Sequence, residues 1–347
     1  MNALPVRAGK AFMGASGFGL GADTADIGAR LGVRAAEFFV SWAQCEPERG
    51  QYQLDGFAKV LDAYEKHGFE TTGMILIRTE DVPEWASAAD DPKERRRHFA
   101  KDPAEFGRFI EALVSRYKAR VHRWSFCCEV DLAVHQWARG FDGYVEMLRA
   151  GAAGAKRADP RCVVGGVGVS GVDCTRNPRF PVARNLWEQL GDVLDGIFFD
   201  AYASPRYFAP GLRVVGPEEN DEVGMLEEAL AIARSKGAGK RISIEEKGWA
   251  IDDRLPVDAP SAREEADVLA RSFVLARSVD AVEHYMWFQL VTRWAEGGYS
   301  YSLFRAEGDH LNPRPGAAAY AWVARFLAGV TAPKRVALHQ NLYAVTF

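Results

Sequence analysis

The chain has 347 residues, of which 48% are hydrophobic and 26% are charged, and its formal net charge is −4. These values are typical of a globular protein, and they exclude a disordered chain, a collagen-like repeat and a small disulfide-stapled domain. Because 47 acidic residues outnumber 43 basic ones, the chain carries no positive excess for phosphates, and nucleic acid is not an expected partner. The aromatic residues, 12% of the chain, suit stacking on sugar rings as well as core packing.

The cysteines and the N-terminus give expectations about compartment. The cysteines are odd in number and irregularly spaced, and no CxxC pair occurs, so neither a disulfide framework nor a structural zinc site is expected. The first residues lack the apolar stretch of a signal peptide, and no run of 18 apolar residues occurs. We therefore expect a cytoplasmic protein without a membrane segment, or a secreted or periplasmic one if a leader has been trimmed.

Eight short apolar segments alternate along the chain with eight amphipathic ones. The short segments are rich in β-branched and aromatic residues, which is typical of strands buried on both faces. The predicted strands are residues 11–15, 35–40, 72–77, 123–128, 163–168, 195–200, 241–246 and 283–289. The predicted helices are residues 23–31, 55–67, 104–118, 142–157, 184–192, 223–236, 262–278 and 316–328.

Strict alternation of strand and helix predicts a parallel sheet with helical crossovers, and eight such units favour a closed (β/α)8 barrel. A nucleotide-binding fold is disfavoured, because neither GxGxxG after a strand nor GxxxxGK[ST] occurs. The barrel should occupy residues 1–330. Residues 331–347 look like a further strand, which either packs on the barrel or begins an accessory β-domain that is cut off here.

Catalysis in such barrels takes place at the C-terminal ends of the strands. Two glutamates, Glu129 and Glu246, stand at the ends of the predicted fourth and seventh strands, which face each other across the barrel. Glycoside hydrolysis requires two carboxyl groups, one protonated and one ionised, on either side of the scissile bond. The long segments 79–103 and 201–222 are expected to form walls of a cleft.

The sequence around both glutamates resembles that of clan A glycoside hydrolases, of the family 39 and family 5 type. The run WSFCCEVDL at 124–132 resembles their fourth-strand motif, in which a Trp leads into Asn-Glu-Pro. The run ISIEEKGW at 242–249 resembles their seventh-strand motif, Thr-Glu-x-Gly-Trp. Residues 32–70, 144–166 and 285–290 resemble the second βα unit, the fourth helix with the fifth strand, and the eighth strand. The resemblance extends from about residue 11 to about residue 329.

This resemblance implies a retaining glycosidase without cofactor or metal, acting on an oligosaccharide or polysaccharide. Glu129 would be the acid/base and Glu246 the nucleophile, with carboxyl groups about 5–5.5 Å apart. Glu245 is the alternative nucleophile. Strand alternation would turn Glu245 to the opposite face, toward the helices and an Arg or Lys, and the spacing to Gly248 and Trp249 favours Glu246.

The sequence departs from the family pattern at four positions. Cys128 stands where the family has the Asn that contacts the sugar 2-hydroxyl, and a thiol is a poor donor. Val130 replaces the following Pro, Glu37 stands at the position of an Arg, and Asp200 at that of a His, although Tyr202 fits the pattern. The two acidic replacements indicate either a subsite for an amino-bearing sugar or, the interpretation we favour, a Glu37 carboxylate paired with Arg78.

Aromatic residues near the strand ends are the expected sugar contacts. Trp287 in the eighth strand is the predicted platform under the sugar, with Trp249, Tyr202 and Trp42 as further contacts. Asp200, Arg78, Glu37 and Cys128 complete the predicted binding set.

Two other functional classes remain open. The departures from the family motifs are compatible with a catalytically silent barrel that binds glycans. A metal-dependent barrel hydrolase is disfavoured, because only seven His occur and none forms an HxH pair after the first strand.

Overall fold

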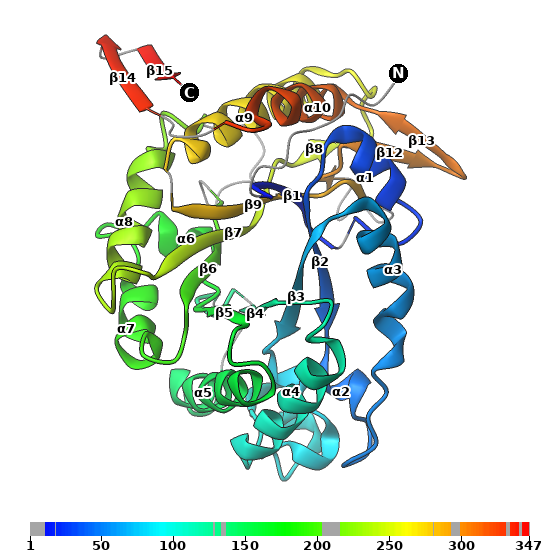
Figure 1. The fold of residues 1–347 in the computed structure, drawn as a ribbon, viewed down its shortest axis with the longest axis vertical. Coiled ribbons are helices and arrows are strands. Elements are labelled where there is room, and N and C mark those ends of the chain that lie inside the picture. The colour runs from blue at the N-terminus through cyan, green and yellow to red at the C-terminus, as the bar shows by residue number, and fades with distance from the viewer. Residues whose placement is uncertain are drawn as a thin grey trace.

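The computed structural model describes residues 11–17, 19–127, 129–132, 137–202, 216–279, 281–292, 299–330, 334–339 and 342–346. Eight parallel strands close into a barrel in the order β1-β2-β3-β4-β5-β6-β7-β9, with the helices around it (Figure 1). The strands are Met13–Ala15 (β1), Ala35–Val40 (β2), Glu70–Leu76 (β3), Arg123–Cys127 (β4), Val163–Gly166 (β5), Gly196–Asp200 (β6), Arg241–Gly248 (β7) and Val282–Phe288 (β9). Each of the eight predicted strands overlaps one of them, and the predicted (β/α)8 barrel is confirmed.

The eight predicted helices are also present, with ends within three residues of those predicted. They are Ala25–Leu31 (α1), Ala58–His67 (α3), Pro103–Tyr117 (α4), Phe141–Ala158 (α5), Pro181–Leu190 (α7), Glu222–Arg234 (α8), Pro260–Arg277 (α9) and Pro315–Leu327 (α10). Asp102 caps α4 by accepting a hydrogen bond from the Ala104 N–H at 2.9 Å. Among the described helices, none combines the length and apolar character that crossing a membrane would require.

Glycine residues allow the neighbouring helices α4 and α5 to pack closely against each other. A Cβ at Gly154 would lie 2.2 Å from the Gly107 carbonyl oxygen, and one at Gly107 would lie 2.8 Å from the Ala150 carbonyl oxygen. Both positions therefore require glycine for the two backbones to approach.

Shorter elements gather in the segments that follow the barrel strands. Between β3 and α4 the chain forms the 3₁₀ turns Thr79–Asp81 (η2), Glu84–Ala86 (η3) and Pro92–Arg97 (η4), so the predicted cleft wall at 79–103 is structured. The other predicted wall, 201–222, lies largely outside the described residues. The remaining elements are Trp42–Cys45 (α2), Asp55–Phe57 (η1), Gly171–Cys174 (α6), Ile251–Asp252 (β8), Val291–Thr292 (β10), Tyr299–Ser300 (β11), Phe304–Glu307 (β12) and His310–Pro313 (β13).

The C-terminal segment forms a hairpin, where the sequence predicted one strand. Lys334–His339 (β14) pairs antiparallel with Leu342–Thr346 (β15), outside the ring of helices (Figure 1). An ion pair between Arg335 and Glu227 connects β14 with α8. Assignment of residues 331–347 to an accessory domain stays a prediction.

Paired charges fill the N-terminal end of the barrel interior. Arg123 of β4 reaches across to Glu283 of β9, with 2.5 Å between Nη1 and Oε2, and Arg241 of β7 binds the same carboxylate. The His284 Nε2 lies 3.2 Å from Glu70 Oε1 of β3. Between the pairs Ile242–Val282 and Ile244–Tyr285, β9 has one residue more than β7. This bulge lets both Glu283 and His284 face inward.

Candidate active site

A bulge in β7 turns both Glu245 and Glu246 toward the barrel interior. On the β6 side, Phe199 pairs with Ile244, and the next residue, Asp200, pairs with Glu246. On the β9 side, Tyr285 pairs with Ile244, and Trp287 pairs with Lys247. One extra residue of β7 thus interrupts the alternation between Ile244 and Lys247. Lys247 faces the helices, with its Nζ 3.4 Å from Glu222 Oε2 of α8. The prediction that Glu245 faces the helical layer is therefore wrong, because alternation assumes a regular strand.

Glu129 and Glu246 lie within electrostatic reach of each other. Burial, together with the negative charge of Glu129, raises the pKa of Glu246 to about 8. The Tyr202 hydroxyl opposes this rise by donating a hydrogen bond to Glu246 Oε2 at 3.4 Å. Burial also raises the pKa of Glu129 to about 7, with a further contribution from Asp131. The predicted carboxyl separation of Glu129 and Glu246 stays a prediction.

Asp131, which the sequence analysis did not select, is held rigidly beside Glu129. Its carboxylate accepts hydrogen bonds from the Ser170 N–H at 2.6 Å, the Ser170 hydroxyl at 2.7 Å and the Asp173 N–H at 3.0 Å. Three donors stabilise the ionised carboxylate. A fixed negative charge therefore lies near the Glu129 carboxyl group.

Glu37 and Asp200 are buried inside the barrel and enlarge the acidic group. Burial raises the pKa of both well above the usual value, with Glu245 and Glu246 adding to the effect on each. The basic residue that lowers the pKa of Glu37 is Arg123. Arg78 forms ion pairs elsewhere, with Asp81 at 2.7 Å and Glu80 at 3.6 Å. The favoured interpretation of Glu37 as the partner of Arg78 is thus replaced by a cluster of carboxyl groups.

Two tryptophans predicted to contact sugar are core residues. Trp287 is fully buried, and its ring packs on Phe273 of α9 with 6.1 Å between centroids, so it faces the helices. Trp42 is also buried, and its Nε1 donates to Glu46 Oε2 at 2.7 Å. Both predictions are wrong, because a tryptophan near a strand end can point to either side of the barrel wall.

A different set of aromatic rings adjoins Glu246. Phe288, next to Trp287 along β9, packs edge-on against Tyr301 with ring centroids 5.5 Å apart. Tyr301 in turn meets Tyr202 at 6.3 Å, and Tyr202 is the hydrogen-bond donor to Glu246. We call Tyr202, Phe288 and Tyr301 the aromatic wall. Tyr202 was predicted from the motif, whereas Phe288 was overlooked in favour of its neighbour.

Trp249, the last of the predicted aromatic contacts, and two further tryptophans, Trp85 and Trp137, have structural contacts. Trp249 follows the end of β7 and belongs to the buried core. Trp85 donates its Nε1 hydrogen to the Glu46 carbonyl oxygen at 3.0 Å, and the Trp137 ring stacks on Tyr144 at 6.0 Å. Cys128 lies outside the described residues, so its predicted place at the sugar 2-hydroxyl has no structural counterpart here.

The closed parallel barrel, with glutamates after β4 and within β7, agrees with the resemblance to clan A glycoside hydrolases that the sequence motifs indicate. Comparison with known families agrees: residues 15–133 match the sequence profile described as Glycosyl hydrolase family 10. The matched segment runs from β1 to just beyond Glu129. The resemblance inferred from the motifs is thereby confirmed at the level of these related enzymes.

Solved structures of glycosidases share the fold. A family 39 glycoside hydrolase from Bacteroides cellulosilyticus WH2 matches with a TM-score of 0.71 and 17% identity, over 94% of this chain and 66% of its own. Xylanase 10B from Thermotoga petrophila RKU-1, solved with xylobiose, matches with a TM-score of 0.67 and 18% identity, over 91% of this chain and 94% of its own. The exo-beta-1,4-mannosidase Op5Man5 from Opitutaceae bacterium strain TAV5 matches with a TM-score of 0.63 and 16% identity, over 94% of this chain and 61% of its own. This chain therefore spans about two thirds of the family 39 enzyme.

Proposed function

We propose that the protein is a retaining glycosidase that cleaves β-glycosidic bonds by double displacement, with Glu246 as nucleophile and Glu129 as acid/base. The observation that carries the proposal is the pair of partly buried carboxyl groups that follow β4 and lie in β7, both with a raised pKa, with the charge of Glu129 contributing to the rise at Glu246. Such a pair is the requirement of glycoside hydrolysis.

Neighbouring groups favour this division of roles. The Tyr202 hydroxyl donates to Glu246 and so stabilises its ionised form, which is the form that attacks. The anchored Asp131 carboxylate repels negative charge on Glu129 and so stabilises its protonated form. The pKa of Glu246, at about 8, nevertheless lies above that of Glu129, at about 7, so the reactive form, with the proton on Glu129 and Glu246 ionised, is the minor form of the pair before substrate binds.

The reaction then follows in two balanced steps. Glu129 gives its proton to the glycosidic oxygen as the bond from that oxygen to the anomeric carbon breaks. The Glu246 carboxylate forms an ester with the same carbon. A water molecule next attacks the anomeric carbon, Glu129 takes the proton of that water, and the ester bond breaks to release Glu246. Two inversions at one carbon retain its configuration.

We assign the substrate class from the site and from the related structures. The aromatic wall offers apolar ring faces beside Glu246, and such faces stack on pyranose rings. The related enzymes include a xylanase solved in complex with xylobiose and an exo-beta-1,4-mannosidase, and the second acts on β-linked sugars by name. A β-linked oligosaccharide or polysaccharide is therefore the proposed substrate.

The test combines a substrate panel with the stereochemistry of the product. Aryl β-glucosides, β-mannosides and β-xylosides, with the matching β-1,4 oligosaccharides, are incubated with the full chain. The first anomer released is then followed by proton NMR. The proposal predicts hydrolysis of at least one class with the β-anomer formed first. Initial formation of the α-anomer would contradict double displacement.

A silent glycan-binding barrel is the second candidate. It is favoured by the crowding of carboxyl groups near Glu246, because the charge of Glu245 adds to that of Glu129 in opposing ionisation of the nucleophile. Calorimetric binding of an oligosaccharide, with no hydrolysis of any panel member between pH 5 and pH 9, would support this candidate over the first.

A further inference from the structure

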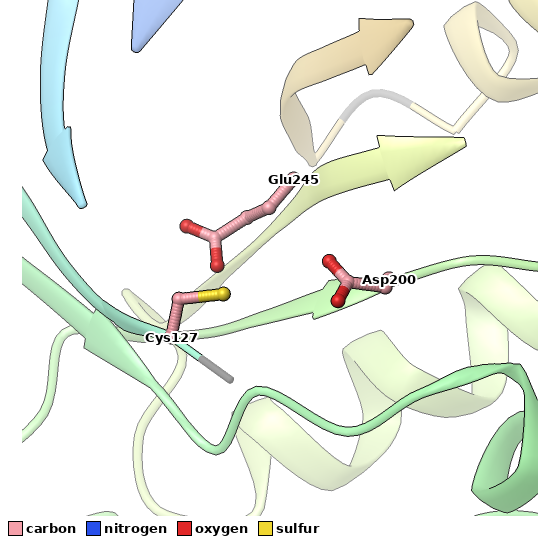
Figure 2. A group of neighbouring side chains, drawn as sticks. All are labelled: Cys127, Asp200 and Glu245. Carbon is pink, nitrogen blue, oxygen red and sulfur yellow. The ribbon is translucent and has the colours of Figure 1, made fainter. Parts of the chain in front are cut away.

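Three side chains from different strands converge inside the barrel beneath the proposed nucleophile. Cys127 of β4, Asp200 of β6 and Glu245 of β7 point toward one another (Figure 2). The Cys127 sulfur and one carboxylate oxygen from each of the others all lie within 4.8 Å of one another. All three residues are buried, at 5%, 1% and 1% exposure. We call Cys127, Asp200 and Glu245 the interior trio.

The trio contains acceptor atoms that the protein leaves unsatisfied. Among the described residues, Asp200 Oδ1 and Glu245 Oε2 are buried and have no hydrogen-bond partner. Glu37 of β2 presents a third such atom, Oε2, and is itself only 1% exposed. Glu37 lies within electrostatic reach of both Glu245 and Asp200. Unpartnered buried carboxylate oxygens are costly, so several at one place indicate a missing positive ligand.

The charged side chains around the interior trio also indicate a missing positive ligand. The basic side chain that acts on both Glu37 and Glu245 is Arg123. Its guanidinium already forms an ion pair with Glu283 at 2.5 Å and lies over the Phe198 ring at 4.1 Å. Arg123 therefore does not neutralise these three further carboxylates, and a compact cation of charge two would offset most of their charge.

We propose that a single Zn²⁺ ion binds inside the barrel between Cys127, Asp200 and Glu245. A thiolate combined with carboxylates is a donor set that zinc accepts, whereas Mg²⁺ and Ca²⁺ prefer oxygen alone. Ligand atoms of a tetrahedral zinc site lie about 3.3–3.6 Å apart. The three ligand atoms of the trio lie within 4.8 Å of one another, so they need to move only slightly closer to hold an ion. All three ligands are buried, so the ion would hold the interior of the barrel together and take no part in bond cleavage.

The first test measures metal binding directly. The full chain is purified without histidine tag, stripped with a chelator, titrated with ZnCl₂ and passed through a desalting column, and zinc is measured by mass spectrometry. We expect one equivalent of retained zinc and a higher melting temperature. Less than a tenth of an equivalent, with an unchanged melting temperature, would overturn the proposal and leave protons as the charge partners of these carboxyl groups.

Variants locate the ion. Cys127→Ser and Glu245→Gln should each weaken zinc binding at least roughly tenfold. Cys162→Ser is the matched control, because Cys162 is also a buried cysteine outside any disulfide but lies just before β5, where its sulfur faces the Ala155 carbonyl oxygen. Undiminished zinc binding in both trio variants, or equal loss in the control, would contradict the site.

Cobalt provides a second measurement that needs no variant. CoCl₂ added to the stripped protein should give the visible bands of tetrahedral Co²⁺ and a near-ultraviolet charge-transfer band from the Cys127 thiolate. Absence of the charge-transfer band would overturn the assignment of Cys127. None of these readouts uses a glycoside, so the failure of this site and the failure of the proposed glycosidase activity are separate results.

Discussion

The two ends of the barrel interior differ in how they compensate charge. At the N-terminal end, Arg123 and Arg241 share the Glu283 carboxylate and His284 lies beside Glu70. Glu283 thus has two arginine side chains within ion-pair distance, and Glu70 has the imidazole of His284, whose pKa is lowered by burial. Such an arrangement stabilises a fold, and this end of an α/β barrel is generally devoted to stability.

At the C-terminal end, like charges are brought together. The carboxyl groups of Glu37, Glu129, Asp200, Glu245 and Glu246 all have raised pKa values, and burial is the first cause for each. A chain selected only for stability would not retain this arrangement. The difference indicates that the C-terminal end of the barrel interior is the functional end, where the proposed glycosidase would exchange protons with a substrate and where a cation would bind.

The largest expected effect is on activity, and it distinguishes the adjacent glutamates Glu245 and Glu246 at the C-terminal end of the barrel interior. Glu246→Gln should abolish turnover on every substrate, because an amide cannot form the glycosyl ester. Glu245→Gln, a matched change one residue earlier on the same bulge, should retain measurable turnover. Steady-state kinetics on an aryl β-glycoside checks both. The reverse pattern would assign the nucleophile to Glu245.

A smaller loss of activity is expected at the acid/base. Glu129→Gln should reduce kcat/KM by about 10²–10⁴-fold on oligosaccharides, whose leaving groups need a proton. Activated aryl glycosides, whose leaving groups need none, should form the glycosyl-enzyme at nearly the wild-type rate. In wild type, activity should fall as pH rises past the raised pKa of Glu129, and the variant should lose this alkaline limb. Equal losses on both substrate types would remove Glu129 from the role.

A substitution at the N-terminal end of the barrel interior, where the charges are paired, should change the free energy of unfolding instead of turnover. Glu283→Gln leaves Arg123 buried without its carboxylate, and the free energy of unfolding should fall by about 3 kcal/mol. Glu146→Gln is the control, since Glu146 pairs with Arg139 at an exposed site and should cost at most about 1 kcal/mol. Urea unfolding measures both variants. An equal effect of the two changes would contradict the contrast between the ends.

The smallest expected effect is on the pH dependence of the melting temperature, measured in the presence of EDTA. The folded-state pKa of Glu37 is raised, so its contribution to stability is complete below the unfolded value of about 4.5 and is lost as pH rises toward the folded value. Glu37→Gln removes this penalty and should raise the melting temperature by a few degrees at pH 8, with little change at pH 5. Glu84→Gln, at an exposed site, should change neither. A lower melting temperature of Glu37→Gln at pH 8 would contradict the account.

The barrel was predictable because its signals are local. Each strand is a short apolar run, each helix carries an apolar stripe, and both glutamates stand within motifs only a few residues long. These features depend on neighbours in sequence, and the structure bears out the positions of all eight strands and helices.

The details of the site were not predictable for the opposite reason. The inward orientation of Glu245 depends on the register of β7 against two other strands, and a single extra residue reverses it. Choosing Trp287 over Phe288 required knowledge of which face of β9 meets α9. Asp131 is significant only because Ser170 and Asp173, about forty residues later, fix its carboxylate beside Glu129.

The central claim is that Glu246 forms a covalent bond with the sugar, and trapping that bond tests it most directly. A 2-deoxy-2-fluoro β-glycoside with an activated leaving group, matched to the preferred sugar, slows the second step more than the first. Intact-mass and peptide analysis should then show one sugar per chain, attached to Glu246. A label on Glu245, or full turnover of ordinary substrates without any covalent label, would contradict the account.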